Sequence, residues 1–357
     1  HFTDRRQRQM CIRDRYEIHK KFGKLSWEEL IQPSITLASK GFRVTNELAE
    51  ALKSEQVKLG KSTNTKKIFF KNGEPLKKDD LLIQTDLANT LKLIAIYGSD
   101  GFYKGETAQK IALDMSNNGG LITTEDLSGY YSKLRDPIIF NYKNLKIASM
   151  PPPSSGGLLL GLMLNMLENF DLSDDPNDVK NILIISEIMQ IAFSLRAKHI
   201  GDEDFYPVPI ENFLSEDIAT ELSKNVNTKR TSTNSEINNT NIIFKENTTH
   251  FSIIDKYGNA VSNTTTLNTG FGSGIVIKDT GILMNNEMDD FSSAPGVENY
   301  FSLLGSEANK IEPKKRPLSS MTPTIVFEDD EVRLITGAQG GGRIITAVLQ
   351  IIINYFE

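Results

Sequence analysis

The segment that decides the fold is NTTHFSIIDKYGNAVSNTTTLN, residues 247–268. β-Branched and aromatic residues are frequent on both sides of a short polar turn, a pattern typical of two strands joined as a hairpin. The turn comprises residues 255–259, and Gly258 ends a three-residue loop at the position where glycine can adopt a left-handed backbone conformation. We therefore expect strands at Thr249–Ile254 and Ala260–Leu267.

A hairpin centred on Tyr257 has one predicted register. Thr248 and Thr266 are each nine residues from Tyr257, so they face each other. Facing Cβ atoms are about 4.5–5.5 Å apart, which allows two hydroxyl groups to form a hydrogen bond. Thr264, Thr266 and Asn268 share one face of their strand because side chains alternate. The pattern alone favours an ordinary structural role for these threonines, since β-branched residues are common in strands.

A polar segment precedes the hairpin. Thirteen of the 23 residues in Asn225–Asn247 are Asn, Ser or Thr, and almost none of the segment is suited to a core. This composition predicts an exposed, mobile loop. A loop of this kind that leads directly into a strand is unusual, and it marks the most informative junction of the chain.

Length and composition indicate an ordinary soluble globular protein. The chain has 357 residues, of which 39% are hydrophobic and 24% charged, so disordered and collagen-like classes are excluded. Its 40 basic and 46 acidic residues give a formal charge of −6, which argues against a general nucleic-acid binder. No apolar run reaches the roughly 18 residues that cross a bilayer. The single cysteine, Cys11, excludes an intramolecular disulfide, a CxxC redox pair and a cysteine zinc site.

Apolar residues recur at helical spacing in several segments. Ser26 and Glu29 have the spacing of a capping box, which predicts a helix start, and Gly41 is a suitable helix end. The stiff segment Pro151–Gly157 leads into an apolar helix that we expect from Leu158. Further helices are expected at Thr85–Ile96, Gly105–Met115, Val179–His199 and Arg343–Glu357.

The two ends of the chain differ from its interior. Residues 1–15 contain five arginines in a chain that otherwise prefers lysine, and they lack an apolar period. We interpret them as a non-native leader. The helix expected at the C-terminal end stops without a cap or a closing polar turn. These features lead us to expect a fragment at both ends.

Longer motifs occur in order along most of the chain. They are Gly101–Gly105, Pro151–Gly157, Gly201–Phe205, Asn247–Ser252, Thr266–Asn268, Asn285–Ser292, Arg316–Met321 and Gly340–Gly341. From about Tyr16 to Glu357 the chain resembles the γ-glutamyltranspeptidases, which are N-terminal-nucleophile hydrolases, and Asn247–Ser252 is similar to their processing site. The resemblance implies an α+β fold with four layers, αββα. Two stacked sheets would lie between helical layers, and Thr248 would begin a strand of the central sandwich.

The resemblance also implies a catalytic role for Thr248. A threonine hydroxyl is a poor nucleophile without an adjacent base, and a free N-terminal amine with a pKa of about 7.7–8.0 can serve as that base. Thr248 has such an amine only after the Asn247–Thr248 bond is cut. The implied self-cleavage begins with attack of the Thr248 hydroxyl on the Asn247 carbonyl, and the resulting ester is hydrolysed. The precursor would give a large-subunit portion, 16–247, and a small-subunit portion, 248–357.

Roles for the other candidate site residues follow from the same resemblance. Thr266 would orient the nucleophile. The backbone N–H groups of Gly340 and Gly341 would form the oxyanion hole. The substrate's α-ammonium group would bind Asn268, Glu287 and Asp290, and its α-carboxylate would bind Ser319 and Ser320.

The implied reaction is γ-glutamyl transfer and hydrolysis. Thr248 would attack the γ-amide of glutathione or another γ-glutamyl compound, and the acyl group would pass to water or to an amino-acid or dipeptide acceptor. The implied partners are these small molecules and the two subunits of one precursor. No cofactor, metal ion or nucleic acid is implied. The expected location, taken from the family, is periplasmic or secreted.

Two alternatives remain open. A cephalosporin or glutaryl acylase would share the fold and the nucleophile but recognise another acyl group, whereas the candidate ammonium and carboxylate ligands favour a substrate with a free α-amino acid. The second alternative is an inactive, unprocessed fragment. The family pairs the substrate carboxylate with an arginine from an early segment of the large subunit, and no segment of this chain matches that region.

Overall fold

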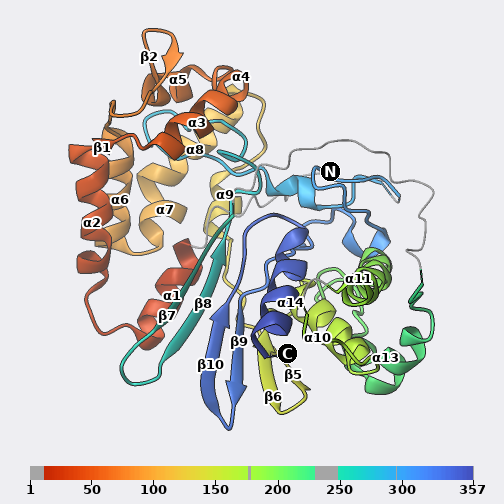
Figure 1. Cartoon of the computed structure of the whole chain (residues 1–357). Coiled ribbons are helices and arrows are strands. Elements are labelled where there is room, and N and C mark those ends of the chain that lie inside the picture. The colour runs from red at the N-terminus through yellow and green to blue at the C-terminus, as the bar shows by residue number, and fades with distance from the viewer. Residues whose placement is uncertain (1–11, 176–177, 230–247, 295, 357) are drawn as a thin grey trace. The chain divides into compact units, whose positions relative to one another are not determined.

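The computed structural model describes residues 12–175, 178–229, 248–294 and 296–356, which form two compact units (Figure 1). Unit 1 consists of His1–Leu134, Leu267–Glu287 and Glu312–Lys314. Unit 2 consists of Arg135–Thr266, Met288–Ile311 and Lys315–Glu357. Each unit therefore combines segments that are far apart in the sequence.

Unit 1 is mostly helical. Its helices are α1 (Ile12–Phe22), α2 (Trp27–Lys40), α3 (Asn46–Ser54), α4 (Gln56–Leu59), α5 (Thr63–Phe69), α6 (Thr85–Tyr97), α7 (Asp100–Tyr103), α8 (Gly105–Asn117) and α9 (Thr124–Ser128). Two short strand pairs join β1 (Phe42–Arg43) to β4 (Leu81–Leu82) and β2 (Phe70–Lys71) to β3 (Glu74–Pro75). Two hydrophobic clusters stabilise the unit, one around Phe102 and Ile111 and the other around Leu52 and Leu59.

Local capping determines where α2 begins and ends, as the sequence predicts. The Ser26 Oγ accepts a hydrogen bond from the Glu29 N–H, and the Glu29 carboxylate accepts one from the Ser26 N–H at 2.9 Å. Gly41 ends the helix with a φ of 77°. The predictions for α6 and α8 are also confirmed, each with a boundary extended by one or two residues.

Helix α1 includes residues 12–15 of the segment that we interpreted as a leader. The Arg13 guanidinium lies 4.5 Å from the centroid of the Tyr103 ring, and its Nη1 donates to the Tyr130 carbonyl. Ile12 packs against the cluster that contains Phe102. Residues 12–15 thus belong to the packed structure of unit 1, whereas residues 1–11 lie outside the described residues.

A four-stranded antiparallel sheet lies at the centre of unit 2. Its order is β10–β9–β6–β5, from strands β5 (Ile138–Tyr142), β6 (Leu145–Ser149), β9 (Thr324–Glu328) and β10 (Glu331–Thr336). In β5, buried and exposed residues alternate, so Ile138, Phe140 and Tyr142 point into the core. One face of the sheet therefore packs against a hydrophobic core.

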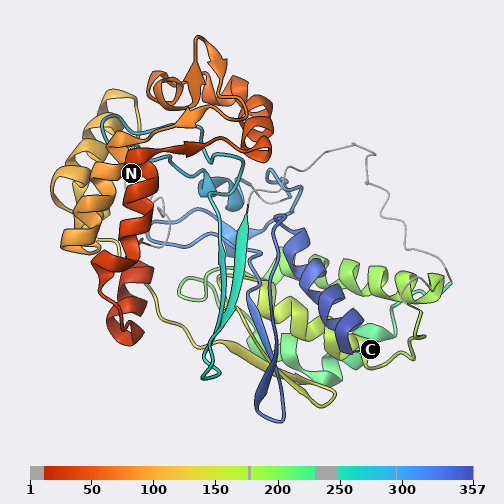
Figure 2. The same ribbon diagram turned by 60° about the vertical axis from the view of Figure 1, so that its left-hand side comes forward.

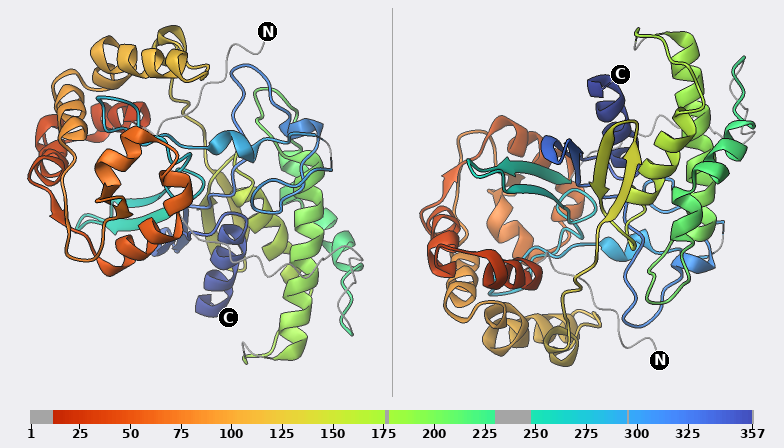
Figure 3. Two further views of the ribbon diagram at one scale, coloured as in Figure 1. Left: turned by 90° about the horizontal axis from the view of Figure 1, so that it is seen from above. Right: turned by 90° about the horizontal axis from the view of Figure 1, so that it is seen from below.

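Helices supply the other side of this core. They are α10 (Gly156–Leu167), α11 (Val179–His199), α12 (Ile210–Leu214), α13 (Glu216–Ser223) and α14 (Arg343–Phe356). All 12 residues of α10 are buried, and Gly161 allows the ring of Phe140 to approach, since a Cβ there would lie 3.3 Å from it. Helix α11 has the predicted bounds and packs along α10 (Figure 3). Helix α14 buries one stripe that includes Ile345 and Val348.

The hairpin of strands β7 (Thr249–Ile254) and β8 (Ala260–Thr265) has the predicted register. Thr249 pairs with Thr265 at one end and Ile254 with Ala260 at the other, and Gly258 has a φ of 83° in the turn. Strand β8 ends two residues earlier than predicted, shortly before Asn268, whose φ is 77°. The hairpin lies along β10 (Figure 2).

Unit 2 therefore contains a helical layer, a four-stranded sheet and a two-stranded hairpin that begins directly after Thr248. The Ser262 Oγ joins the hairpin to β10 by donating to the Thr336 carbonyl at 2.9 Å. The predicted mobile loop falls mainly on residues 230–247, which lie outside the described residues. Across the described ranges, no helix is both long and apolar enough to cross a membrane.

Candidate active site

The predicted pair of threonines meets at the open end of the hairpin. Thr248 is only 6% exposed, and its Oγ1 donates a hydrogen bond to the Thr266 Oγ1 at 3.2 Å. The ladder that pairs Thr249 with Thr265 carries this register on to Thr248 and Thr266. The hairpin thus fixes one threonine hydroxyl against another at a site that is largely shielded from water.

His250 lies beside this pair and is held by hydrogen bonds of its own. Its Nδ1 lies 2.8 Å from the Thr264 Oγ1, and its Nε2 lies 3.1 Å from the Ser252 Oγ. Burial lowers the pKa of His250 below its ordinary value, which favours the neutral ring at neutral pH. A Cβ on Gly337 would clash with this ring, 2.2 Å from its Nδ1. The glycine segment, Gly337–Gly342, which follows β10, therefore starts in contact with His250. The histidine has a structural role in this arrangement.

The glycine segment leads into the N-terminus of α14. Gly340 and Gly341 have positive φ angles of 120° and 57°. The Arg343 N–H donates to the Gly340 carbonyl at 3.1 Å, and the Ile344 N–H donates to the Gly341 carbonyl at 3.2 Å. Among the described residues, no acceptor takes a hydrogen bond from the N–H of either glycine. N–H groups at a helix N-terminus are suited to bind negative charge.

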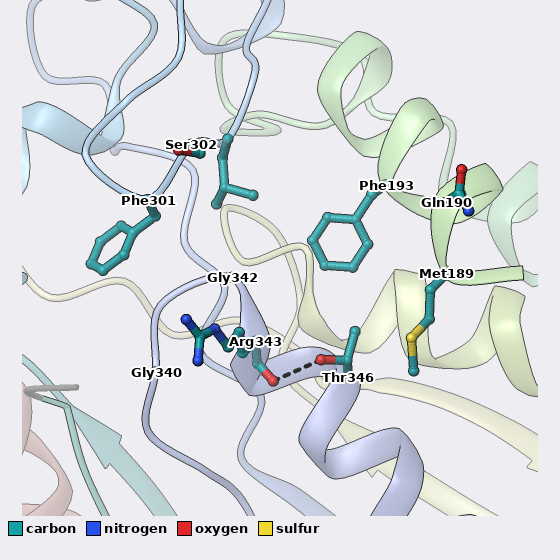
Figure 4. Close-up of a pocket in the computed structure, with 10 residues that line it drawn as sticks. Met189, Gln190, Phe193, Phe301, Ser302, Gly340, Gly342, Arg343 and Thr346 are labelled. Carbon is teal, nitrogen blue, oxygen red and sulfur yellow. Dashed lines mark hydrogen bonds between the residues drawn. The ribbon is translucent and has the colours of Figure 1, made fainter. Parts of the chain in front are cut away.

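A pocket of about 380 Å³ opens beside Gly340 (Figure 4). Phe193 and Met189 line it from α11, and Phe301 and Leu303 line it from the loop before η2 (Glu307–Asn309). The remaining lining residues are Gln190, Ser302, Gly342, Arg343 and Thr346. The pocket can therefore accommodate an apolar group next to a candidate oxyanion-hole residue.

Phe301 also packs directly on the glycine segment. A Cβ on Gly341 would lie 2.4 Å from the Phe301 ring, and a Cβ on Gly342 would lie 3.0 Å from Leu303. A larger residue at either position would crowd Phe301 or Leu303, and the positive φ of Gly341 also disfavours a side chain. Glycine is therefore required here. The loop and the glycine segment therefore determine each other's position.

Ser319 and Ser320 are held by the proline-rich segment that precedes α10. The Ser319 N–H donates to the Pro153 carbonyl at 2.8 Å, and the Ser155 N–H donates to the Ser319 carbonyl at 2.9 Å. The Ser155 Oγ donates to the same Ser319 carbonyl at 3.0 Å. The segment Pro151–Gly157 thus holds the backbone of Ser319 in place. No sequence pattern had indicated this contact.

Arg196 of α11 also contacts both of these segments. Its side chain is buried, with the residue 4% exposed. The Nε donates to the Ser155 Oγ at 2.9 Å, and the Nη2 donates to the Ser320 Oγ at 3.1 Å. Sequence analysis did not identify this residue, although a single arginine on the mainly apolar helix Val179–His199 was a possible signal.

Asp290 is partly buried, and the charge of Arg196 acts on its carboxylate. Burial raises the pKa of Asp290 to about 7, the positive charge of Arg196 opposes this shift, and Asp289 adds to it. The Asn309 Nδ2 donates to the Asp290 carbonyl at 2.7 Å, while the Leu318 N–H donates to the Asn309 Oδ1 at 2.9 Å. Asn309, which sequence analysis also missed, thus ties the Asp290 segment to the chain just before Ser319.

Asn268 and Glu287, the other two candidate ammonium ligands, belong to unit 1. Asn268 is 4% exposed, and its Nδ2 donates to the Asn286 carbonyl at 3.2 Å. The Glu287 N–H donates to the Asn285 Oδ1 at 3.1 Å. Neighbouring asparagines therefore fix the local backbone around both residues.

A buried ion cluster fixes the chain before the two serines. Asp202 is fully buried, and its carboxylate accepts from the Arg135 Nη2 at 2.9 Å and from the Arg316 N–H at 2.8 Å. The Arg135 Nη2 also lies 2.9 Å from a carboxylate oxygen of Asp204. The motif Gly201–Phe205 thus anchors the segment that contains Ser319. Within the ranges that the structure describes, no cluster of three potential metal ligands is present.

Comparison with known sequences places these features in a family. The family model for gamma-glutamyltranspeptidase matches residues 11–357. A glutathione hydrolase proenzyme of Escherichia coli (strain K12) is 45% identical over 341 residues, covering 94% of this chain and 59% of the relative. A glutathione hydrolase proenzyme of Bacillus subtilis (strain 168) is 39% identical over 354 residues, covering 94% and 58%. The chain thus spans about three fifths of the length of the curated relatives it matches.

Solved structures support the same relationship and confirm the predicted fold class. The cephalosporin acylase of Bacillus halodurans is similar with a TM-score of 0.82 and 25% identity, over 95% of this chain and 60% of that chain. The γ-glutamyltranspeptidase of Helicobacter pylori is similar with a TM-score of 0.60 and 38% identity, over 62% and 64%. The fold is therefore the α+β fold of the N-terminal-nucleophile hydrolases. With its threonine pair, its glycine segment and the family motifs in order, this chain belongs to the gamma-glutamyltranspeptidase family.

Proposed function

We propose that the chain carries the processing site and nucleophile of a γ-glutamyltransferase that also hydrolyses glutathione. The observation that carries the proposal is the hydrogen bond between Thr248 and Thr266, which holds a buried hydroxyl at the residue before β7. The relatives from Escherichia coli and Bacillus subtilis are called proenzymes, which supports maturation from a precursor. In that maturation, residues 16–247 and 248–357 belong to the large and small subunits.

Maturation begins at the Thr248 hydroxyl. Its Oγ1 attacks the Asn247 carbonyl carbon, the hydroxyl proton passes to the Thr248 nitrogen, and this nitrogen leaves the tetrahedral intermediate as the free amine, so an ester replaces the peptide bond. Water then hydrolyses the ester, which frees the Asn247 carboxylate and restores the Thr248 hydroxyl beside the Thr248 amine. Asn247 lies outside the described residues, so the proposal rests here on the position of Thr248.

In the mature enzyme, the Thr248 amine acts as the general base for its own hydroxyl. The Oγ1 attacks the γ-amide carbon of the donor, and the amine passes the proton to the leaving nitrogen. The developing oxyanion is stabilised by the Gly340 and Gly341 N–H groups, which precede α14. Water or an amino-acid or dipeptide acceptor then takes the γ-glutamyl group from the ester, and Thr266 keeps the hydroxyl oriented throughout.

Recognition of the donor uses its free α-amino acid. The α-carboxylate accepts hydrogen bonds from Ser319 and Ser320, and the α-ammonium group binds Asn268, Glu287 and the ionised form of Asp290. The charges of these groups complement those of a γ-glutamyl compound, which supports such a compound over a glutaryl donor because the latter lacks the ammonium group. No cofactor or metal ion takes part in the proposal, and its expected location is the periplasm or the cell exterior.

The proposal is tested by following both maturation and turnover. Denaturing gel electrophoresis should show two fragments, and N-terminal sequencing of the smaller one should begin at Thr248, whereas Thr248→Ala should stay intact. The mature protein should release the anilide from γ-glutamyl anilide and transfer the acyl group to a dipeptide. A band that stays whole for days at 39.9 kDa would support the inactive fragment, and turnover of only glutaryl anilide would support an acylase.

A further inference from the structure

Arg196 occupies an unusual place among the charged residues of unit 2. Its guanidinium is buried, and among the described residues no carboxylate lies within ion-pair distance of it. Its hydrogen bonds go instead to two hydroxyl groups, the Ser155 Oγ at 2.9 Å and the Ser320 Oγ at 3.1 Å. A buried cation is costly unless its surroundings compensate for the lost water, so its presence here calls for an explanation.

The chemistry of the guanidinium sets the direction of the neighbouring hydrogen bonds. Arginine has only donors, so both serine oxygens must accept from it. The Ser155 hydroxyl hydrogen is then left to donate, and it donates to the Ser319 carbonyl at 3.0 Å. By the same reasoning, the Ser320 hydroxyl hydrogen is left to donate to another group. Such a hydrogen is what an anionic ligand of Ser320 requires.

We infer that Arg196 is a positioning residue, which orients the Ser320 hydroxyl as a donor. The inference rests on the proposed function, because it assigns Ser320 to the substrate's α-carboxylate and Asp290 to its α-ammonium group. At 4% exposure Arg196 acts through these two residues. The buried guanidinium therefore positions one residue of the carboxylate half of the recognition site, and its charge acts on Asp290 in the ammonium half.

The effect on Asp290 is electrostatic. Burial raises the pKa of this carboxyl, and the cation of Arg196 lowers it. Among the described residues, the adjacent Asp289 also acts on Asp290 and raises its pKa. Removing the Arg196 charge should therefore raise the pKa of Asp290 further, so that binding of the substrate ammonium group requires a higher pH.

Two substitutions at position 196 separate the two effects. Arg196→Gln removes the charge and the fork of donors, so we expect KM for γ-glutamyl anilide to rise about 30-fold or more with kcat little changed. The acidic limb of kcat/KM should also move to higher pH. Arg196→Lys keeps the charge but offers a point donor in place of the planar fork, so KM should rise while the acidic limb stays in place.

Controls distinguish these effects from a general loss of structure. Self-cleavage before Thr248 reports a folded site without added substrate, and it should proceed in both variants. Lys198→Gln removes an exposed cation from the same helix and should leave KM and the pH profile unchanged. If Arg196→Gln does not mature, Ser155→Ala takes its place and should raise KM with the acidic limb unmoved, because it removes only one partner of Arg196.

The outcomes for the inference and for the proposed function differ. Wild-type protein that turns over only glutaryl anilide overturns the proposed function. Glutaryl anilide keeps the carboxylate but lacks the ammonium group, so Arg196→Gln should still raise its KM, with no shift of the acidic limb. Unchanged KM and an unchanged pH profile for Arg196→Gln, with either anilide, would overturn the inference.

Discussion

Thr248 and Thr266 face each other across the hairpin, with their Oγ1 atoms 3.2 Å apart. Thr248 donates in this hydrogen bond, so the Thr266 oxygen limits the rotation of the candidate nucleophile. Thr266→Val keeps the shape of the side chain but removes the oxygen. We expect self-cleavage and turnover to slow by about tenfold to a hundredfold, measured as the rate of band splitting and as kcat for γ-glutamyl anilide.

Thr266→Ser is the matched control for that change, because it keeps the hydroxyl and loses one methyl group. It should process and turn over substrate at close to the normal rates. Equal rates for Thr266→Val and the unmodified protein would show that the contact has no orienting role.

Gly341 is the second position at which a small change should have a large effect. Its φ is +57°, and a Cβ there would lie 2.4 Å from the Phe301 ring. Gly341→Ala must therefore move both the backbone and Phe301. If the N–H of Gly341 stabilises an oxyanion, kcat should fall by about a hundredfold to a thousandfold.

Gly258→Ala is the control for backbone strain alone. Gly258 also has a positive φ, +83°, but a Cβ there would meet no atom within 4 Å. This variant should lose about 1 kcal/mol of stability in urea unfolding and keep its activity. A similar loss of kcat in both variants would mean that the effect at Gly341 comes from strain.

The titration of Asp290 should make activity rise and stability fall as the pH increases. Its pKa is raised to about 7, so protonation below pH 7 should remove the negative charge that binds the substrate ammonium group. We expect kcat/KM to fall as the pH drops through this value. Asp290→Asn should abolish this part of the pH dependence and raise KM.

The same shift predicts a stability gain for Asp290→Asn. The folded protein holds this proton more tightly than the unfolded chain, where the pKa of Asp is about 3.9, so stability falls as the pH rises between about 4 and about 7. The Asn variant avoids this fall. Urea unfolding should show it to be the more stable protein at pH 8, with no such advantage at pH 4, and a variant that is less stable at pH 8 would contradict the assignment.

Asp202 should be important for stability because it is fully buried and joins two chain segments. Its carboxylate accepts from Arg135 and from the Arg316 N–H. Asp202→Ala leaves a buried guanidinium with fewer partners, and we expect a loss of about 3–5 kcal/mol in urea unfolding. Asp100→Ala removes an exposed pair with Lys104 and should cost less than about 1 kcal/mol.

Local patterns predict the elements of this protein well. The capping box at Ser26, the bounds of the helix Val179–His199 and the register of the hairpin depend on residues within about 20 positions of one another, so sequence spacing contains the information. Placing Thr248 opposite Thr266 requires only the centre of the turn. Local spacing is therefore sufficient to predict this juxtaposition.

Partners that are distant in the sequence cannot be predicted in this way. The Arg196 side chain bonds to Ser155 and Ser320, which are 41 and 124 positions away, and no periodic pattern encodes such contacts. Asn309, the last residue of η2, lies nearer to its partners, 19 positions from Asp290 and 9 from Leu318, but neither a helical nor a strand period relates these positions. Packing of the helices on the sheet brings the Arg196 contacts together, so they become visible only with the fold.

Helix α10, whose every residue is buried, affects how the chain can be made. Its apolar surface packs in one cluster with β9 and α14, and these elements follow it in the sequence by more than 150 residues. During synthesis on the ribosome, α10 emerges long before those partners exist. An apolar helix without its partners is prone to aggregate, so the nascent chain should depend on chaperones for longer than its size alone suggests.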